Sequence, residues 1–131
     1  MNLIIEIEGL RKSIGGRSVI RELELTARPG EIISLLGPSG CGKSTLLGLI
    51  AGLIRPDAGT IRMNGKTLAS ATAFVPPEKR SMNMVFQDYA LWPHMTVADN
   101  IAYGLKRQRT PPAAIRARTE ELMALLRLNG F

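Results

Sequence analysis

The stretch "LLGPSGCGKSTLL", residues 35–47, places three glycines within six positions, directly after an apolar run and just before a lysine. Residues 37–44 match the pattern G-x-x-x-x-G-K-[ST], which lies between a buried strand and a helix in phosphate-binding proteins. Glycine has no Cβ in the way, so backbone N–H groups can converge on phosphate oxygens, and the following helix points its positive end at the same anion. The stretch therefore predicts a loop that holds the polyphosphate tail of a nucleotide.

The residue types in this loop predict separate roles. Lys43 is expected to bind the β- and γ-phosphates as a catalytic cation, Ser44 to ligate Mg²⁺, and Thr45 to bond an α-phosphate oxygen. Cys41 is open to two interpretations: a small residue tolerated in a loop, or a thiol whose alkylation blocks the nucleotide. The predicted nucleotide contacts here are Gly37, Pro38, Ser39, Gly40, Cys41, Gly42, Lys43, Ser44 and Thr45.

The composition is that of a globular protein. The chain has 131 residues, 45% of them hydrophobic and 21% charged, which suits one small domain. The single cysteine excludes an intrachain disulfide and favours a reducing compartment. Glu6 and Glu8 interrupt the first apolar residues, so no signal peptide is expected. The longest apolar run, residues 46–54, is far shorter than the roughly 20 residues of a membrane-spanning helix.

The formal net charge of +6 raises the question of a nucleic-acid partner. Several basic residues lie close together near the end of the chain, but no aromatic residues alternate with them to stack on bases. We therefore predict a solvated basic face and no nucleic-acid partner. The residues concerned are Lys106, Arg107, Arg109, Arg116 and Arg118.

Two kinds of strand are predicted. Residues 5–8, 23–26 and 60–63 alternate apolar and polar side chains, which is typical of antiparallel strands with one face in water, and the turn pair Asn64-Gly65 follows the third. Residues 32–36 and 84–86 are almost continuously apolar, as in a parallel sheet covered on both faces. The mixture predicts an α/β fold, a P-loop core with an antiparallel sheet beside it.

Three helices are predicted. The first begins near Lys43 and ends near Gly52 and Pro56, and the second begins at the cap Thr96. The third has Thr110 as its cap and Pro111 as its first residue. Its apolar stripe is Ile115, Leu122, Leu125 and Leu126, and it ends at Asn129 and Gly130. Residues 66–82 are expected to form a connecting loop.

A second motif narrows the class of nucleotide protein. "MVFQDYALWPHMTVADNI", residues 84–101, resembles the glutamine loop of ATP-binding cassette (ABC) transporter ATPases. Residues 35–66 and "PPEKRSMNMVFQ", residues 76–87, are similar to the same family. The likeness is greatest to the importer group that serves sugars, polyamines, iron(III) and sulfate-type anions.

The resemblance implies roles for several residues. Gln87 would contact Mg²⁺ or the attacking water and sense the γ-phosphate. Residues 87–93 would line the groove that receives a helix of the membrane-spanning permease subunit, with Tyr89 and Trp92 as anchors. The alternative is that both residues belong to an ordinary local core. His94 is expected to be a turn residue rather than a catalyst.

The chain also departs from the family pattern. Family members usually place an aromatic residue near Ile14 to stack on adenine, and Ile14 offers apolar contact but no π-face. The family has three further motifs, which would follow Phe131: the L-S-G-G-Q signature, a strand ending in Asp-Glu and the switch histidine. The family strands that flank residues 32–36 would follow Phe131 as well. This sequence contains none of them. The resemblance thus implies an incomplete ABC ATPase domain, with a nucleotide-binding and antiparallel part over about 1–86, and the glutamine loop with the start of a helical subdomain over about 87–131.

Two functions remain open from the sequence. The first is the ATP-binding part of an import ATPase, using ATP and Mg²⁺ at the cytoplasmic face of the membrane beside a permease and a second ATPase subunit. The second is a binding module that holds nucleotide without turnover. A GTPase is disfavoured, because the sequence has no Asn-Lys-x-Asp motif to read guanine.

Overall fold

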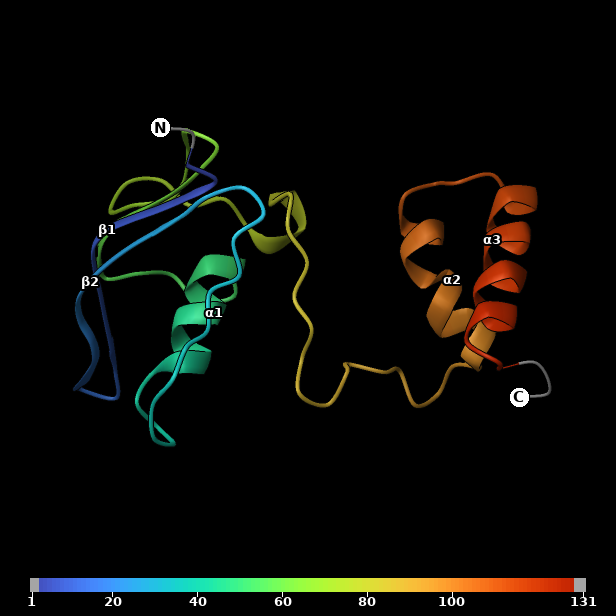
Figure 1. Cartoon of the computed structure of the whole chain (residues 1–131), viewed down its shortest axis with the longest axis horizontal. Coiled ribbons are helices and arrows are strands. Elements are labelled where there is room, and N and C mark those ends of the chain that lie inside the picture. Colours follow the sequence, from blue (N-terminus) through green and yellow to red (C-terminus); the bar gives the residue numbers. More distant parts are fainter. Residues whose placement is uncertain (1–2, 129–131) are drawn as a thin grey trace. The chain divides into compact units, whose positions relative to one another are not determined.

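The computed structural model describes residues 3–128 and divides into two compact units between Met84 and Val85. The first unit holds β1 (Ile5–Ile14), β2 (Arg17–Ala27), α1 (Lys43–Ala51), β3 (Ala58–Met63), β4 (Lys66–Ala69) and the 3-10 helix η1 (Pro77–Lys79). The second holds α2 (Val97–Arg107) and α3 (Pro112–Leu125). In Figure 1 the first unit runs from blue to yellow-green along the chain, and α2 and α3 are orange to red.

The sheet of the first unit is antiparallel, with the strand order β2-β1-β3-β4. Its central strands alternate as predicted: Ile7 and Ile61 are buried and lie opposite each other, whereas Glu8 is exposed and pairs with Arg62 at 3.1 Å. The turn at Asn64 and Gly65, where both φ angles are positive, leads from β3 into β4. The three antiparallel strands expected from the alternation are confirmed.

The helix α1 packs on this sheet. Leu46 and Leu49 of α1 join Ile7, Leu10 and Ile61 in one buried cluster, which is the core of the first unit. The helix begins at Lys43 and ends at the cap Gly52, as the sequence predicted. Packing of this apolar face holds the first turn of α1, and with it the glycine-rich loop, against the sheet.

Residues 32–36 do not form the predicted buried strand. They have no regular secondary structure, and Ile32 and Leu36 are more than nine-tenths exposed, while Leu35 packs against the core cluster. A strand needs a neighbour for its N–H and C=O groups, and no strand among residues 3–128 pairs with this segment. Residues 84–86 likewise have no regular secondary structure and do not form the predicted strand. The fold is α/β, but its described sheet is the antiparallel one alone.

Residues 66–82 are more ordered than the predicted connecting loop. The turn at residues 64–65 brings β4 back along β3, and Ala69 then forms a further bridge with Phe74. η1 follows at Pro77, whose fixed φ suits the first position of a helix. The loop prediction was wrong here because β4 is only four residues long and carries no clear alternation.

Arg80 fastens the end of α1 to the segment after β4. Its guanidinium is buried and donates to the carbonyls of Leu49 at 2.9 Å, Val75 at 2.8 Å and Leu68 at 3.3 Å, and also to that of Ile50. Burial lowers the pKa of Arg80, but a guanidinium still stays charged at neutral pH. A cation at the carbonyl end of a helix is stabilising.

In the second unit, α2 and α3 lie side by side and are joined by residues 108–111 (Figure 1). Thr96 caps α2 as predicted, since its hydroxyl accepts the backbone N–H of Asp99 at 3.1 Å. Hydrogen bonds from Lys106 and from Thr96 hold the pKa of Asp99 below its usual value. This cap fixes the start of α2 within residues 84–101, the stretch that resembles the glutamine loop.

The start and stripe of α3 differ from the prediction. Pro111 is the extended cap and Pro112 the first helical residue, so Thr110 is not the cap. A residue before a proline is disfavoured in helical conformation, which moves the start one residue along. α3 packs on α2, but Leu125 and Leu126 are exposed rather than part of a buried stripe. The predicted end at residues 129–130 lies outside the described residues.

Candidate nucleotide-binding site

The glycine-rich loop wraps around the Lys43 side chain. The Lys43 ammonium donates to the carbonyls of Gly37 at 2.7 Å and Pro38 at 2.8 Å, and lies 3.5 Å from the Cys41 sulfur. These contacts hold the charge over the loop rather than out in solvent. An anion brought to the loop would meet a cation that is already positioned there.

Gly42 joins the loop to α1 and requires glycine. Its φ of 101° is a left-handed value that other residues avoid, and a Cβ there would lie 3.0 Å from the Val19 side chain and 3.3 Å from the Val19 carbonyl. Strand β2 therefore lies directly against the loop at the start of α1. This close approach brings the β1–β2 hairpin to the glycine-rich loop.

One cavity of about 430 Å³ collects most of the predicted nucleotide contacts. The structure places Ile14 of β1 in it together with loop residues, although Ile14 lies far from them in sequence. Its complete lining is Ile14, Arg17, Val19, Ser39, Gly40, Gly42, Lys43, Ser44 and Thr45. Gly37 and Pro38 border the site through their carbonyl contacts with Lys43. Cys41, which is exposed, lines a neighbouring cavity of the same unit together with Lys43.

The electrostatics of this cavity favour an anion. Two of its lining residues are cationic, Arg17 and Lys43, and none of them is acidic. The first turn of α1 also carries no acidic residue, so nothing there neutralises the positive end of the helix. The Ser44 hydroxyl lies in this turn and is suited to ligate a hard cation such as Mg²⁺ alongside phosphate oxygens.

Arg17 is a site residue that the sequence analysis missed. It lines the cavity, yet no phosphate-loop motif includes it. A signal was present: Gly15 and Gly16 form a two-residue turn, so the residue after the turn lies opposite Ile14. Reading the hairpin register from the sequence would have found it.

Gln87 belongs to the second compact unit. Gln87 is exposed and is the first residue of a turn over residues 87–90. Within this turn, Tyr89 and Ala90 have left-handed φ values. Asp88 accepts the backbone N–H of Ala90 at 3.2 Å and supports that turn. The contact of Gln87 with Mg²⁺ stays a prediction.

The aromatic residues after Gln87 are divided between surface and local packing. The side chain of Tyr89 is 75% exposed, and Leu91 is also exposed. Trp92 is 38% exposed, and its ring centroid lies 4.2 Å from that of Tyr103 on α2. His94 lies in a turn, as predicted. The segment thus presents apolar side chains to solvent while one aromatic ring is anchored on α2.

Asn100 fixes this segment to α2. Its side chain accepts the backbone N–H of Trp92 at 2.9 Å and donates to the carbonyls of Trp92, Met95 and Thr96. One amide therefore satisfies backbone groups across residues 92–96. These bonds fix the part of the segment that follows Leu91, from Trp92 to the start of α2.

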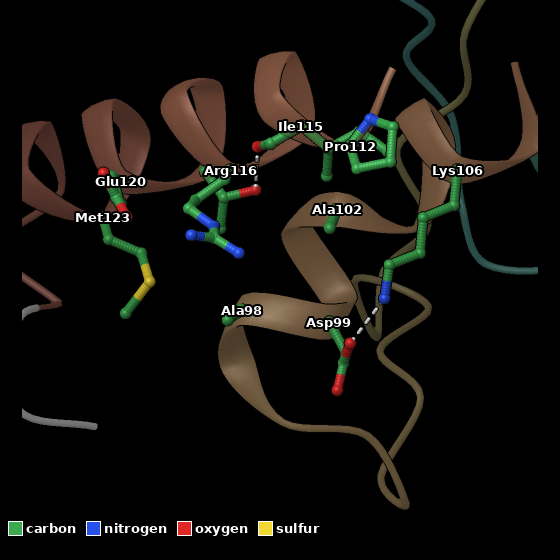
Figure 2. Close-up of a pocket in the computed structure, with 10 residues that line it drawn as sticks. Ala98, Asp99, Ala102, Lys106, Pro112, Ile115, Arg116, Glu120 and Met123 are labelled. Atoms are coloured by element: carbon green, nitrogen blue, oxygen red, sulfur yellow. Dashed lines mark hydrogen bonds and ion pairs between the residues drawn. The ribbon is translucent and has the colours of Figure 1, made fainter. Parts of the chain in front are cut away.

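A larger cavity of about 510 Å³ lies between α2 and α3 and is not part of the predicted site. Figure 2 shows Ala98 and Ala102 facing Ile115 and Met123, with the ion pair of Asp99 and Lys106 at one side. Small residues on α2 leave this space. The structure shows no group of three or more metal-ligating side chains here or elsewhere in residues 3–128, and no helix in that range is long and apolar enough to cross a membrane.

The comparison with known families agrees with the motifs. The model of the ABC transporter family matches residues 20–131, so the chain belongs to that family. A solved structure described as a nucleotide-free ATP-binding cassette from an ABC transporter is similar in fold, with a TM-score of 0.50 and 27% sequence identity, covering 51% of this chain and 26% of the other.

Within this family, the chain is similar to curated proteins that share one name. The chain is 48% identical over 98% of its length to the spermidine/putrescine import ATP-binding protein PotA of Methylococcus capsulatus, and 46% identical to proteins of the same name from Marinobacter nauticus and Escherichia coli K12. It spans about a third of their length: 32% of the first relative and 33% of the other two.

Proposed function

We propose that the chain forms the ATP-binding part of an ABC-type import ATPase that energises uptake of polyamines. The cavity that gathers Ile14, Lys43, Ser44 and Thr45 at the positive end of α1 is the observation that carries the proposal. Membership of the family and likeness to spermidine/putrescine import proteins support the direction and the solute class.

In this proposal the phosphates lie on the loop. Backbone N–H groups at the start of α1 bind the phosphate oxygens, and the Lys43 ammonium exchanges its loop carbonyls for the β- and γ-phosphates. The Ser44 hydroxyl would hold Mg²⁺, which supplies charge neutralisation between the phosphates when bound. It offers an oxygen ligand, which suits this cation.

The partners proposed for the intact protein are a membrane-spanning permease subunit and a second ATPase subunit, at the cytoplasmic face of the membrane. The segment of residues 87–93 supports the first, because Tyr89 and Leu91 are exposed on it, and the backbone of Trp92 next to them is hydrogen-bonded to Asn100. Exposed apolar and aromatic side chains are typical of protein interface anchors.

A second candidate is a nucleotide-binding module without turnover. No acidic side chain lines the cavity among residues 3–128, so no general base is in place to activate water there. Single-turnover hydrolysis of labelled ATP by the purified chain distinguishes the two. Phosphate release that Lys43→Ala abolishes supports the ATPase, whereas nucleotide binding without release supports the module.

The polyamine assignment has its own test. Disrupting the gene in its native host is expected to lower uptake of labelled spermidine and to leave uptake of maltose and sulfate unchanged. Loss of sulfate or maltose uptake with normal spermidine uptake would assign a different solute.

A further inference from the structure

The tip of the β1–β2 hairpin places two side chains side by side. Ile14 and Arg17 are directly paired across the strands and close a turn made of Gly15 and Gly16. Directly opposed residues of an antiparallel pair lie on one face of the sheet with neighbouring Cβ atoms. The position where the family usually carries an aromatic residue therefore has a guanidinium next to it.

Strand β2 determines which cavity Ile14 and Arg17 line. Val19 lies against Gly42 at the start of α1, and Arg17, two residues before it on β2, lines the same cavity. Ile14, Arg17 and Val19 all line the cavity that also contains the phosphate-binding residues 42–45. The hairpin tip is thus one wall of the nucleotide cavity.

The chemistry of this wall is unusual for a base site. Ile14 provides an aliphatic surface without π electrons, so it cannot stack on a purine. A guanidinium is planar and delocalised, and arginine planes do stack on nucleic-acid bases. Arg17 is exposed and makes no hydrogen bond or ion pair with any side chain of residues 3–128, so nothing in that part of the chain holds its plane away from the cavity.

We propose that Arg17 is a base-contacting residue of the nucleotide site, where its guanidinium plane packs on the purine beside Ile14 and replaces the missing aromatic ring. This inference rests on the proposed function, because it requires a nucleotide on the phosphate-binding loop. It adds a consequence for specificity: contact through a flat face tolerates different bases, so ATP and GTP are bound with similar affinity.

The test compares three probes by calorimetry in the presence of Mg²⁺: ATP, GTP and inorganic tripolyphosphate, which has no base. Arg17→Ala is expected to weaken ATP and GTP about fivefold to tenfold each and to weaken tripolyphosphate clearly less, because that probe loses only a nearby charge and no base contact. Arg17→Lys, which keeps the charge but not the plane, is expected to behave like the alanine variant. Arg107→Ala, an exposed charge of the second unit, is the control and leaves all three affinities unchanged.

A compensating variant tests the replacement directly. Ile14→Trp supplies the aromatic face, so it is expected to raise ATP affinity and to make a further Arg17→Ala change nearly silent. A loss of tripolyphosphate binding equal to that of ATP, or full rescue by Arg17→Lys, would identify Arg17 as a phosphate contact and overturn the inference. If the wild type binds ATP and Arg17→Ala changes nothing, the inference also fails while the proposed function stands. If the wild type binds neither tripolyphosphate nor ATP, the proposed function itself fails.

Discussion

Replacing the buried Arg80 by methionine tests how the core holds the end of α1. Methionine keeps much of the volume of the side chain but removes the guanidinium that donates to four carbonyls. The end of α1 and the segment after β4 then lose their shared donor. We expect a large loss of stability in the first unit, with the second unit unaffected.

The magnitude follows from which carbonyls keep a partner. The Leu49 carbonyl still accepts the N–H of Gly52 at 3.3 Å. The Leu68 carbonyl still accepts the N–H of Val75 at 2.7 Å. The carbonyls of Ile50 and Val75 have no second donor that the structure shows within residues 3–128. The bonds from Arg80 to these two carbonyls are only partly buried, so water can replace part of what is lost. At about 0.5–1.5 kcal/mol for each lost hydrogen bond, the expected fall in unfolding free energy is about 1–3 kcal/mol.

The assay is urea unfolding followed by far-ultraviolet circular dichroism, with native-state hydrogen exchange at the amides of Leu49 and Ile61 to report on the first unit. The only tryptophan, Trp92, lies in the second unit, so its fluorescence transition serves as an internal control. Arg80→Lys is expected to cost about half as much, because an ammonium keeps the charge but reaches fewer carbonyls.

Arg21→Met is the matched control. Arg21 is exposed, so the same substitution there is expected to change unfolding free energy by no more than about 0.5 kcal/mol. If Arg80→Met costs as little as the control, the guanidinium does not hold the end of α1, and the reasoning is refuted. A loss seen equally in both units would refute the assignment of Arg80 to the first unit alone.

Three further predictions concern the loop, a cap and an ion pair. Alkylation of the exposed Cys41 is expected to abolish ATP binding, and saturating ATP to slow labelling about tenfold or more; equal labelling rates with and without ATP would contradict this. Thr96→Ala is expected to cost about 1 kcal/mol in the Trp92 fluorescence transition, with Thr96→Ser near wild type; an equal cost for both would mean that the hydroxyl is not the cap. Hydrogen bonds from Lys12 and from the backbone of residue 13 lower the pKa of Asp57 below 3.8, so its stabilisation is present above about pH 4 and lost as the pH falls through the folded-state pKa. Asp57→Asn should therefore be less stable than wild type at pH 7 and equally stable near pH 2; a pH-independent difference would exclude the ion pair as the cause.

The elements predicted well were those decided by local chemistry. The glycine-rich loop fixed the start of α1 at Lys43, and the hydroxyl of Thr96 fixed the start of α2. Alternation of side chains located the antiparallel strands, because one face of that sheet is wet. Each of these signals lies within a few residues of the feature that it predicts.

Other features that the sequence did not predict depend on contacts that are distant in the chain. The apolar run at residues 32–36 has the composition of a buried strand, but composition cannot supply the neighbouring strand that would pair with it. Arg80 is a charged residue in a Pro-rich segment, which usually indicates a solvated position, and only the folded structure shows its carbonyl partners. The place of Arg17 in the cavity beside the glycine-rich loop likewise depends on the hairpin register rather than on any local motif.

The central claim is that the loop before α1 binds the polyphosphate of ATP with the help of one ammonium group. Calorimetric titration of the folded chain with Mg²⁺ and ATP, beside Lys43→Ala, tests it most directly. The account predicts one nucleotide bound per chain and affinity at least about tenfold lower in the variant. A folded wild type that takes up no nucleotide, or a variant that binds as tightly as the wild type, would contradict it.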